Sequence, residues 1–416
     1  MTPIYIFEDD RLEQLYPLTY ARPAFELRCG AGTLLDRMDR CLPRPPAGVL
    51  VREALADRVA RKIRFPVNPR IDPLPGAIFI NARWLMTAPP PESNPDTAGL
   101  INGSFAWLHV SGKKLAEMDM SRMTPAACHA LGATLRAVAA EAVLIDHPWD
   151  LIVHQHEILL ADFAARGPAI RSEPMPGAHI LHPQNVFISS DVRIYPGVVL
   201  DAQSGPIMID HGTQIQPNAV ITGPVYIGPD CIIRPGANIR ADTSLGPFCR
   251  VGGEVIGSIF LANANKQHEG FVGQSVVGEW ANLGAGTTTS NLKNTYGMVR
   301  VPINGGEQET GLRFLGSVIG DHAKIGIGTY LKTGSVIGFA SHIITSRPPK
   351  FVPSFAWVGE KGIEPLDFHK AVAIAQAATG RREGAFTPAD ERIFAHIQQH
   401  SRKVEKFHWS QSPPAA

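Results

Sequence analysis

Aliphatic residues recur at every sixth position through the middle of the chain. The first series comprises Ile209, Ile215, Ile221, Ile227, Ile233, Ile239, Leu245 and Val251. The same phase returns in Ile319, Ile325, Leu331, Ile337 and Ile343, with Val277 and Leu283 between the two series. A period of six fits neither an α-helix nor an alternating strand, but it is typical of a short strand plus a turn, three of which close a triangular coil. The pattern therefore predicts a parallel β-helix with coils stacked at roughly 4.8 Å, in preference to a β-sandwich with accidental spacing.

The six-residue period is interrupted twice. The first interruption, at about residues 253–276, contains His268, and the second, at about 287–315, contains several polar side chains. Insertions in a solenoid usually leave its face as loops, and binding surfaces form there. We therefore expect both interruptions to loop out and to carry the chemistry of this part of the chain.

The segment before the solenoid, residues 1–175, alternates between strand-like and helix-like stretches. The strand-like stretches lie at 4–9, 47–51 and 77–81, and the helix-like ones at 52–63 and 125–144. This mixture predicts an α/β layer domain with a largely parallel sheet. The segment 147–163 is expected to close that domain before a Pro- and Gly-rich joint.

Two helices are predicted after the solenoid, at residues 365–382 and 389–404. Thr387, with Asp390 three residues later, is a capping pattern for the second helix. These helices are expected to flank or cover the end of the β-helix, whose last coil would otherwise expose an open edge. The chain thus divides into an α/β domain at 1–175, a β-helix at 176–347 and a helical extension at 348–416.

Composition narrows the class of protein. The 416 residues are 44% hydrophobic and 19% charged, with a formal net charge of +1. Such a balanced chain has no field to attract nucleic acid or an anionic membrane, and no apolar run approaches the roughly 20 residues that span a bilayer. The five cysteines are scattered and never in CxxC spacing. These features predict reduced thiols in a soluble, cytoplasmic protein without a signal peptide.

Groups able to bind and activate a substrate gather in the two interruptions. His268 suits a general base for an attacking amine or hydroxyl, because imidazole is the side chain that can take up a proton near neutral pH. Lys266 offers a charge for a phosphate, and Asn291 and Asn294 offer amides for sugar hydroxyls. The glycine-rich run at 284–289 offers backbone N–H groups for a thioester oxyanion or a pantetheine arm. The alternative is that all of these are solvated loop residues.

Zinc binding is a competing use of the histidines, because neighbouring coils of a β-helix can bring imidazoles together. The available side chains are His211, His268, His322 and His342. No pair has short metal-ligand spacing and no carboxylate accompanies them in a clear pattern, so the metal alternative is disfavoured. His154 and His156 would share one face of a strand, but a third ligand is not apparent.

The first domain offers fewer candidate binding residues than the solenoid. The metal candidates are Asp9 and Asp10, and the nucleotide- or phosphate-binding candidates are Arg22, Arg28, Gly30 and Gly32. Acids at the end of a strand can hold Mg²⁺, and arginines near a strand exit can clamp a nucleotide phosphate. An alternative role for Arg22 and Arg28, at least as well supported as phosphate binding, is to form surface ion pairs with Glu26.

The chain resembles a known family at these residues. The stretch NKQHEGFVGQSVVGEWANLGAGTTTSNLKNTYG at 265–297, with the hexapeptide series around it, is similar to bifunctional sugar-1-phosphate nucleotidyltransferase/acetyltransferases, in particular to a variant, GlmU-like branch. The opening FEDD acids and PLTYARPAFELRCGAGTLL are also typical of that branch. The resemblance implies a pyrophosphorylase-like α/β domain, a left-handed β-helix, and a homotrimer packed along these β-helices.

The resemblance also assigns residue roles. His268 matches the base for N-acetylation of an amino-sugar phosphate, and Asn291 matches an asparagine near the amino sugar. The substrate-binding candidates are Lys266, Phe271, Asn291, Lys293, Asn294 and Tyr296, and the acyl-CoA-binding candidates are Gly284, Ala285, Gly286 and Thr287. Phe271 stands where the well-studied branch has a tyrosine, and Lys266 lies one residue closer to the histidine than the lysine of that branch.

The first domain departs further from the family pattern. Well-studied nucleotidyltransferases carry a glycine-rich loop that ends in an arginine and is followed by a Pro-Lys pair, and FEDDRLEQLYPLTYARPAFELR has none. Backbone cradling of a triphosphate must therefore be done differently or not at all.

The leading hypothesis is a two-site enzyme of sugar-nucleotide synthesis, as in a UDP-N-acetylglucosamine pathway. One site would join a sugar-1-phosphate to a nucleoside triphosphate with Mg²⁺, and the other would transfer an acyl group from acetyl-CoA to an amino-sugar phosphate. The alternatives are a single-activity acyltransferase or nucleotidyltransferase with the other domain degenerate, or a non-enzymatic sugar-nucleotide sensor or scaffold. No nucleic-acid or membrane partner is expected.

Overall fold

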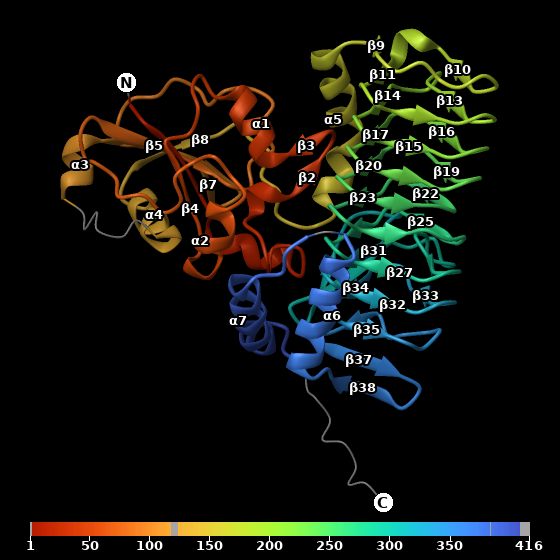
Figure 1. The fold of residues 1–416 in the computed structure, drawn as a ribbon. Coiled ribbons are helices and arrows are strands. Elements are labelled where there is room, and N and C mark those ends of the chain that lie inside the picture. Colours follow the sequence, from red (N-terminus) through yellow and green to blue (C-terminus); the bar gives the residue numbers. More distant parts are fainter. Residues whose placement is uncertain (1, 118–123, 383, 408–416) are drawn as a thin grey trace, which may run out of the picture.

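The computed structural model describes residues 2–117, 124–382 and 384–407, which form an α/β domain, a β-helix and two C-terminal helices (Figure 1). The α/β sheet has the order β4-β1-β5-β7-β6-β8. Its strands are β1 (Ile4–Phe7), β4 (Gly48–Leu50), β5 (Gly76–Asn81), β6 (Thr97–Ile101), β7 (Ser104–Ser111) and β8 (Arg136–Ala139). Because β7 runs antiparallel to both β5 and β6, the sheet is mixed rather than largely parallel.

The first domain contains one of the two predicted helices, a shortened form of the other, and three helices that the sequence did not predict. They are α1 (Leu34–Cys41), α2 (Glu53–Ala60), α3 (Gly112–Ala116), α4 (Pro125–Gly132) and α5 (Asp150–Arg166), with 3₁₀ turns η1 (Asp10–Leu15) and η2 (Ala24–Glu26). The single helix expected at 125–144 is wrong, since α4 ends at Gly132 and the edge strand β8 follows. Gly132 lies so close to Phe105 that an added Cβ would approach its ring to 2.7 Å, so this end of the helix is held tightly against the sheet.

The β-helix confirms the six-residue period. Its three sheets, parallel except for the last pair β37–β38, are named here the docking sheet, the helix-covered sheet and the outer sheet. The docking sheet contains β9 (Ala169–Ile170), β11 (Val186–Ile188), β14 (Ile207–Ile209), β17 (Val225–Ile227), β20 (Thr243–Leu245), β23 (Ile259–Phe260), β26 (Val276–Val277), β31 (Ser317–Ile319), β34 (Ser335–Ile337) and β36 (Phe351–Val352). The repeated aliphatic side chains are buried inside the prism.

The other two faces are built in the same way. The helix-covered sheet contains β12 (Arg193–Ile194), β15 (Gln214–Ile215), β18 (Ile232–Ile233), β21 (Arg250–Val251), β24 (Asn265–Lys266), β27 (Asn282–Leu283), β32 (Lys324–Ile325), β35 (His342–Ile343), β37 (Ala356–Gly359) and β38 (Gly362–Pro365). The outer sheet contains β10 (His179–Leu181), β13 (Val199–Asp201), β16 (Val220–Thr222), β19 (Asn238–Ile239), β22 (Glu254–Ile256) and β25 (Phe271–Gly273). Solenoid strands thus occur at residue 169 and again as late as 365, on both sides of the expected limits 176 and 347.

The first interruption of the period is not a loop. Leu245 pairs with Phe260, and Phe260 pairs with Val277, so the coils continue through this region with fewer residues each. The prediction that residues 253–276 leave the solenoid is therefore wrong. Shortened coils shift the phase of the repeat, and Lys266 takes an inward position beside Val251.

The second interruption does loop out, as predicted. β26 pairs directly with β31, and the long coil between them contains the hairpin β29 (Arg300–Ile303) and β30 (Gly306–Glu309). The remaining short strands are β2 (Arg28–Cys29), β3 (Gly32–Thr33), β28 (Thr288–Thr289) and β33 (Tyr330–Leu331), and a 3₁₀ turn η3 spans Pro183–Asn185. Val301 and Ile303 of the hairpin are buried in the core that also holds the first domain.

The C-terminal helices α6 (Phe368–Gly380) and α7 (Pro388–Val404) lie between the first domain and the lower solenoid (Figure 1). The predicted capping box of Thr387 and Asp390 begins α7. Phe394 of α7 packs against Phe339 of the solenoid, with ring centroids 4.8 Å apart. The helices therefore flank the β-helix and join it to the first domain. None of the helices in the described ranges is long and apolar enough to cross a membrane.

Candidate functional sites

The carboxyl ends of β1 and β5 place a buried ion pair at one edge of the first sheet. Asp9 accepts hydrogen bonds from Nε and Nη2 of Arg83, at 2.8 and 2.6 Å. The amide of Asn81 donates to the same carboxylate at 2.8 Å. Arg83 has no exposed surface and also pairs with Asp146. Both oxygens of Asp9 are thus engaged within the protein.

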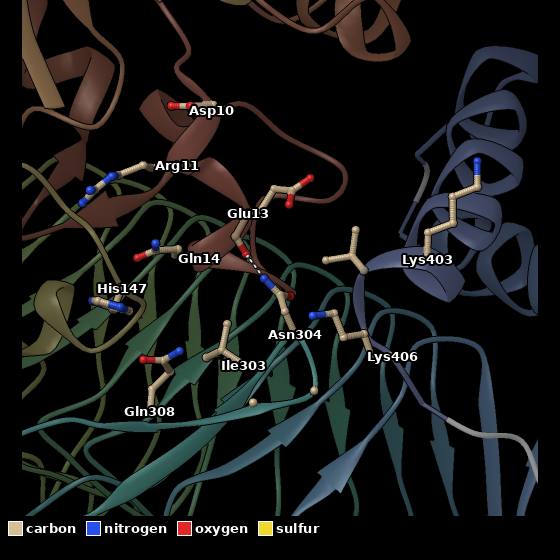
Figure 2. A pocket seen from close by; sticks show the side chains of 13 residues that line it. Asp10, Arg11, Glu13, Gln14, His147, Ile303, Asn304, Gln308, Lys403 and Lys406 are labelled. Atoms are coloured by element: carbon tan, nitrogen blue, oxygen red, sulfur yellow. Dashed lines mark hydrogen bonds between the residues drawn. The ribbon is translucent and has the colours of Figure 1, made fainter. Parts of the chain in front are cut away.

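A cavity of about 620 Å³ lies beside this edge, between η1, the hairpin β29–β30 and the end of α7 (Figure 2). Arg11, Lys403 and Lys406 bring positive charge to it, and Asp10 and Glu13 bring negative charge. The remaining lining residues are Gln14, His147, Ile303, Asn304, Gly305, Gly306, Gln308 and Val404. Four segments that are far apart in sequence, His147 among them, therefore build one cavity.

The hairpin and the end of α7 are fixed against the first domain. The side-chain amide of Asn304 donates to the backbone oxygen of Glu13 at 2.8 Å, as Figure 2 shows. At Gly305 an added Cβ would meet the backbone oxygen of Glu405 at 2.7 Å, and its φ of +78° also favours glycine. This close approach leaves Lys406 beside the cavity, with its amine directed into it (Figure 2).

A second cavity of about 430 Å³ adjoins the same edge and shares Asp10 and Glu13 with the first. Its other walls include Arg52 of the sheet domain and His396 and His400 of α7. His400 contacts Tyr16 Oη at 3.0 Å, and burial raises the pKa of that phenol to about 12. In α/β sheets, ligands usually bind outside the carboxyl ends of the strands, so these two cavities are the candidate nucleotide-binding site.

The arginines predicted to bind phosphate lie elsewhere, at the contact with the solenoid. Arg22 Nη2 lies 3.0 Å from Glu279 Oε2 and 2.5 Å from Asp321 Oδ2. The guanidinium of Arg28 lies over the ring of Tyr226, 5.6 Å from its centroid. A nucleotide-binding role for the two arginines stays a prediction, and their visible contacts join the first domain to the docking sheet.

Gly30 and Gly32 belong to the same contact. The N–H of Gly30 donates to Gln155 Oε1 at 2.9 Å, and its backbone oxygen accepts from the hydroxyl of Ser244 at 2.6 Å. An added Cβ at Gly30 would lie 2.3 Å from Asp162, so only glycine fits there. The turn at Gly30–Gly32 is therefore pressed between α5 and the solenoid, and the structure does not bring it to the candidate nucleotide-binding cavities.

The predicted metal pair is divided between two environments. Asp9 is held by Arg83 and Asn81, whereas the side chain of Asp10 is 72% exposed and lies 4.0 Å from His129. Within the described residues, no three His, Cys, Asp or Glu side chains converge on a common point. Mg²⁺ is usually held by one or two carboxylates together with substrate phosphates, and Asp10 fits such a site without a protein cage.

His268 lies on an exposed turn between β24 of the helix-covered sheet and β25 of the outer sheet. Lys266, in contrast, is 1% exposed, and its amine donates to the backbone oxygens of His268 at 2.5 Å and of Glu269 at 3.0 Å. Burial lowers the pKa of Lys266 to about 8. The lysine predicted to bind a phosphate therefore shapes the turn that presents the histidine, and its phosphate-binding role stays a prediction.

The glycine-rich run lies one coil further along the solenoid than residues 267–270, the turn that contains His268 and is called here the histidine turn. The N–H of Gly286 donates to the oxygen of Glu269 at 3.1 Å, and Gly284 and Thr287 donate to backbone oxygens as well. An added Cβ at Gly270 would lie 2.2 Å from the oxygen of Thr287, so the two turns touch. Of the four predicted acyl-CoA-binding residues, only Ala285 has an N–H to which the described part of the chain gives no acceptor.

The other predicted substrate-binding residues fall into two groups. Phe271 begins β25, three residues after His268, and the amide of Asn291 donates to Gln274 Oε1, just beyond that strand, at 2.6 Å. Lys293 and Asn294 line a separate cavity of about 590 Å³ together with Tyr330. Tyr296 is 70% exposed and lies outside both groups. The structure therefore brings the turn that contains His268 against the glycine-rich run, and it brings Phe271 and Asn291 together beside Gly273.

Sequence reasoning missed Arg11, Asn304, Lys403 and Lys406. These residues line the cavity of about 620 Å³ between η1, the hairpin and the end of α7, which is called here the composite cavity. Arg11 directly follows Asp10, a predicted metal ligand, and the two lysines lie at the end of a predicted helix. The sequence therefore places each of them locally, but not together. Their meeting depends on where α7 and the hairpin pack, and no local pattern reports that. Similarly, the paired histidines 154 and 156 lie on the helix α5 rather than on a strand, so they do not share one face.

The family comparisons agree with this geometry. Residues 4–167 match the family described as sugar nucleotidyl transferase, and residues 206–241 match the bacterial transferase hexapeptide repeats. Both matches are therefore to families of transferases, and the hexapeptide match agrees with the predicted left-handed β-helix. The predicted resemblance to bifunctional, GlmU-like nucleotidyltransferase/acetyltransferases is confirmed by named relatives.

The chain is 36% identical over 167 residues to the bifunctional protein GlmU of Methanococcus aeolicus, covering 40% of this chain and 39% of the relative. It is 38% identical over 168 residues to the bifunctional protein GlmU of Methanococcus maripaludis, covering 39% and 41%. A bifunctional sugar-1-phosphate nucleotidylyltransferase/acetyltransferase of Sulfurisphaera tokodaii is 36% identical over 90 residues, 22% of each chain. The chain therefore spans less than half the length of these relatives.

One solved structure, of an Arabidopsis UDP-N-acetylglucosamine acyltransferase, aligns at 13% identity over 56% of this chain and 92% of that chain. Its TM-score of 0.20 is too low to carry an argument.

Proposed function

We propose that the chain is a two-site sugar-nucleotide enzyme, with nucleotidyl transfer in the first domain and acyl transfer on the β-helix. The observation that carries the proposal is the match of two transferase families to two domains, each of which has its own candidate site. The names of the bifunctional GlmU relatives support the same pair of activities.

Acyl transfer would take place where the histidine turn meets the glycine-rich turn. The amine of an amino-sugar phosphate attacks the thioester carbonyl of an acyl-CoA, His268 accepts the amine proton, and the CoA thiolate leaves. The unpartnered N–H of Ala285 is suited to donate to the oxyanion that forms on the carbonyl oxygen. We assign contact with the sugar to Phe271, three residues after His268, and to Asn291, which lies beside Phe271 near Gly273.

Nucleotidyl transfer would take place at the carboxyl edge of the first sheet. A phosphate oxygen of the sugar-1-phosphate attacks the α-phosphorus of the nucleoside triphosphate, and pyrophosphate leaves. Asp10 would hold Mg²⁺, which neutralises phosphate charge when bound. Arg11, Lys403 and Lys406 supply the remaining positive charge, in place of the missing glycine-rich loop.

One observation favours a second candidate function, acyl transfer alone. Both oxygens of Asp9 are engaged by Arg83 and Asn81, and the first domain has no glycine-rich phosphate loop. In that case the first domain would bind a sugar nucleotide without transforming it.

We also propose that the chain assembles as a homotrimer along its solenoids and that it works in the cytoplasm. Large apolar side chains remain exposed on successive coils of the β-helix: Ile327 is 79% exposed, Ile344 57% and Tyr330 55%. Exposed apolar surface of this kind usually marks a contact between proteins. Light scattering coupled to size exclusion would measure the assembly, and a monomer at micromolar concentration would refute it.

A paired assay on the purified chain tests the proposed function. One arm follows pyrophosphate release from nucleoside triphosphates with sugar-1-phosphates and Mg²⁺, and the other follows free thiol from acetyl-CoA with amino-sugar phosphates. Activity in both arms is expected and would identify both substrates. Thiol release alone would support the second candidate function, and inactivity in both arms across the substrate panel would refute the two-site proposal.

A further inference from the structure

The last turn of α7 carries two cations of the composite cavity and one buried acid. Lys403 and Lys406 are exposed and line the cavity, and Figure 2 shows both at the end of the helix. Glu405 precedes Lys406 directly and is 6% exposed. Among the described residues after Ser401, it is the only one that is buried. The position of this turn therefore depends strongly on the side chain of Glu405.

Glu405 joins the last turn of α7 to the first domain and to the solenoid. Its Oε1 accepts from Tyr20 Oη of the first domain at 3.0 Å and from Ser354 Oγ of the solenoid at 2.5 Å. Its Oε2 accepts the backbone N–H of Ser354 at 2.8 Å. The backbone oxygen of Glu405 lies against Gly305, where an added Cβ would approach it to 2.7 Å. One residue thus fixes the end of α7 to the parts that surround it.

These contacts suit a carboxylic acid. Both hydroxyls near Oε1 can accept a hydrogen bond as well as donate one, so a proton on Oε1 has an acceptor while Oε2 accepts the N–H. Glu405 forms no ion pair with a Lys, Arg or His side chain of the described ranges. A buried carboxylate without a cation is costly, and burial raises the pKa of Glu405 to about 7.

The charged groups of the first domain lie one side chain further from Glu405. Tyr20 stacks on Tyr16, with ring centroids 3.9 Å apart. Burial raises the pKa of both phenols, so both stay neutral near pH 7. Arg52 donates to Tyr16 Oη at 3.4 Å rather than to Glu405. The first domain therefore presents a neutral hydroxyl to the buried acid.

The other elements around Glu405 do not neutralise a negative charge there either. On α7, His400 lies 3.4 Å from Glu13, and burial lowers the pKa of this histidine. Lys403 and Lys406 are exposed to solvent. The facing groups of the solenoid and of its hairpin are hydroxyl and backbone groups without charge. Loss of the proton from Glu405 therefore leaves an unpaired charge in the joint.

We propose that Glu405 is a positioning residue for the composite cavity, which fixes the last turn of α7 while it holds its proton and releases that turn when the proton passes to solvent. Release would carry Lys403 and Lys406 away from the first domain. An anion bound between these lysines and the first domain would hold the turn in place, because it binds the fixed state better than the released one. The inference concerns the regulation of the proposed nucleotide site and rests on that site for its role in catalysis.

Hydrogen exchange of the full chain at pH 6 and pH 8, read on the peptide that ends α7, tests the inference. The helix α6 is the internal reference, because intrinsic exchange accelerates with pH at every amide. With a pKa of about 7 in the fixed turn and an ordinary value of 4.5 in the released turn, fixation is full below pH 4.5 and is lost as the pH rises through 7. Release should therefore become about tenfold more favourable between pH 6 and pH 8.

The test variant is Glu405→Gln, whose amide can donate to the two hydroxyls and accept the N–H of Ser354 as the protonated acid does. We expect the wild type to lose about tenfold more protection than this variant between the two pH values. The histidines of α7 titrate in both proteins and cancel in the comparison. Glu360→Gln, an exposed acid in the turn between β37 and β38, is the matched control and should behave as the wild type.

Inorganic pyrophosphate is the anion probe. At pH 8 it should restore protection to the end of α7 in the wild type, and it should fail to do so in the double variant Lys403→Gln and Lys406→Gln. Equal pH dependence in wild type and Glu405→Gln, or a wild-type peptide that pyrophosphate does not protect, would overturn the proposal. A chain that shows the expected exchange pattern but releases no pyrophosphate in the paired assay would support this inference and refute nucleotidyl transfer.

Discussion

The two candidate sites of this chain are built in opposite ways. The acyl-transfer site joins turns of neighbouring coils, in which Gly286 bonds to Glu269 across one coil spacing. The nucleotide site joins η1 of the first domain to a solenoid hairpin and to the end of α7, from residue 10 to residue 406. A repeat brings functional residues together by its period, whereas a composite cavity depends on how separate parts pack.

The largest expected effect is at the site built from neighbouring coils. His268→Ala should lower the rate of thiol release by roughly 10²–10⁴-fold, the usual contribution of a general base. His211→Ala is the matched control, because His211 is also exposed on the solenoid and lies outside the site. A rate that falls equally in both variants, or in neither, would remove His268 from the mechanism.

The next effect concerns the contact between the two regions. Arg22→Met should lower the free energy of unfolding by about 3–5 kcal/mol, because it leaves Asp321 buried without its ion-pair partner, whereas Glu279 keeps Arg58 and Lys62. Arg240→Met breaks the more exposed pair with Glu254 and should cost less than about 1 kcal/mol. Denaturant titration measures both. If Arg22→Met instead leaves stability unchanged and abolishes pyrophosphate release, the predicted phosphate role is correct.

A smaller effect should appear in the pH dependence of stability. Glu405, at the end of α7, accepts bonds from Ser354 of the solenoid and Tyr20 of the first domain. Burial raises the pKa of this carboxyl from 4.5 to about 7. The folded chain therefore binds more protons than the unfolded chain between these values, so the contribution of Glu405 to stability is full below pH 4.5 and is lost as the pH rises through 7.

Denaturant titrations between pH 4.5 and 8 should show this loss as a difference in slope between wild type and Glu405→Gln. The expected difference is on the order of 1 kcal/mol per pH unit. Histidines that titrate in the same range contribute to both proteins and cancel in the comparison. Parallel curves would mean that Glu405 has an ordinary pKa, and that α7 is not joined to both regions through a protonated carboxyl.

The smallest expected effect is at the composite cavity. Lys406→Gln removes one of three cations, and Arg11 and Lys403 remain, so pyrophosphate release should fall by about tenfold or less. Steady-state kinetics over a range of salt concentrations should also show a weaker salt dependence. Lys361→Gln, in the turn between β37 and β38, is an exposed control. Unchanged kinetics would place the nucleotide outside this cavity.

The same contrast explains what the sequence revealed. The aliphatic series at Ile209 and onward predicted the β-helix because each repeat buries the same kind of side chain. The prediction that residues 253–276 leave the solenoid was wrong, because shortened coils shift the phase of the repeat without ending it. The series also could not show that the side chain of Lys266 points into the solenoid. Arg22 and Arg28 looked like phosphate ligands because their buried partners, Glu279 and Tyr226, lie far away in sequence.

The central claim is that two separate sites work on one chain, and one measurement tests it most directly. Pyrophosphate release and thiol release are assayed together on the wild type, His268→Ala and Lys406→Gln. We predict that His268→Ala loses thiol release and retains pyrophosphate release, and that Lys406→Gln lowers only pyrophosphate release. Loss of both activities in either folded variant, or a wild type with only one activity, would contradict the two-site account.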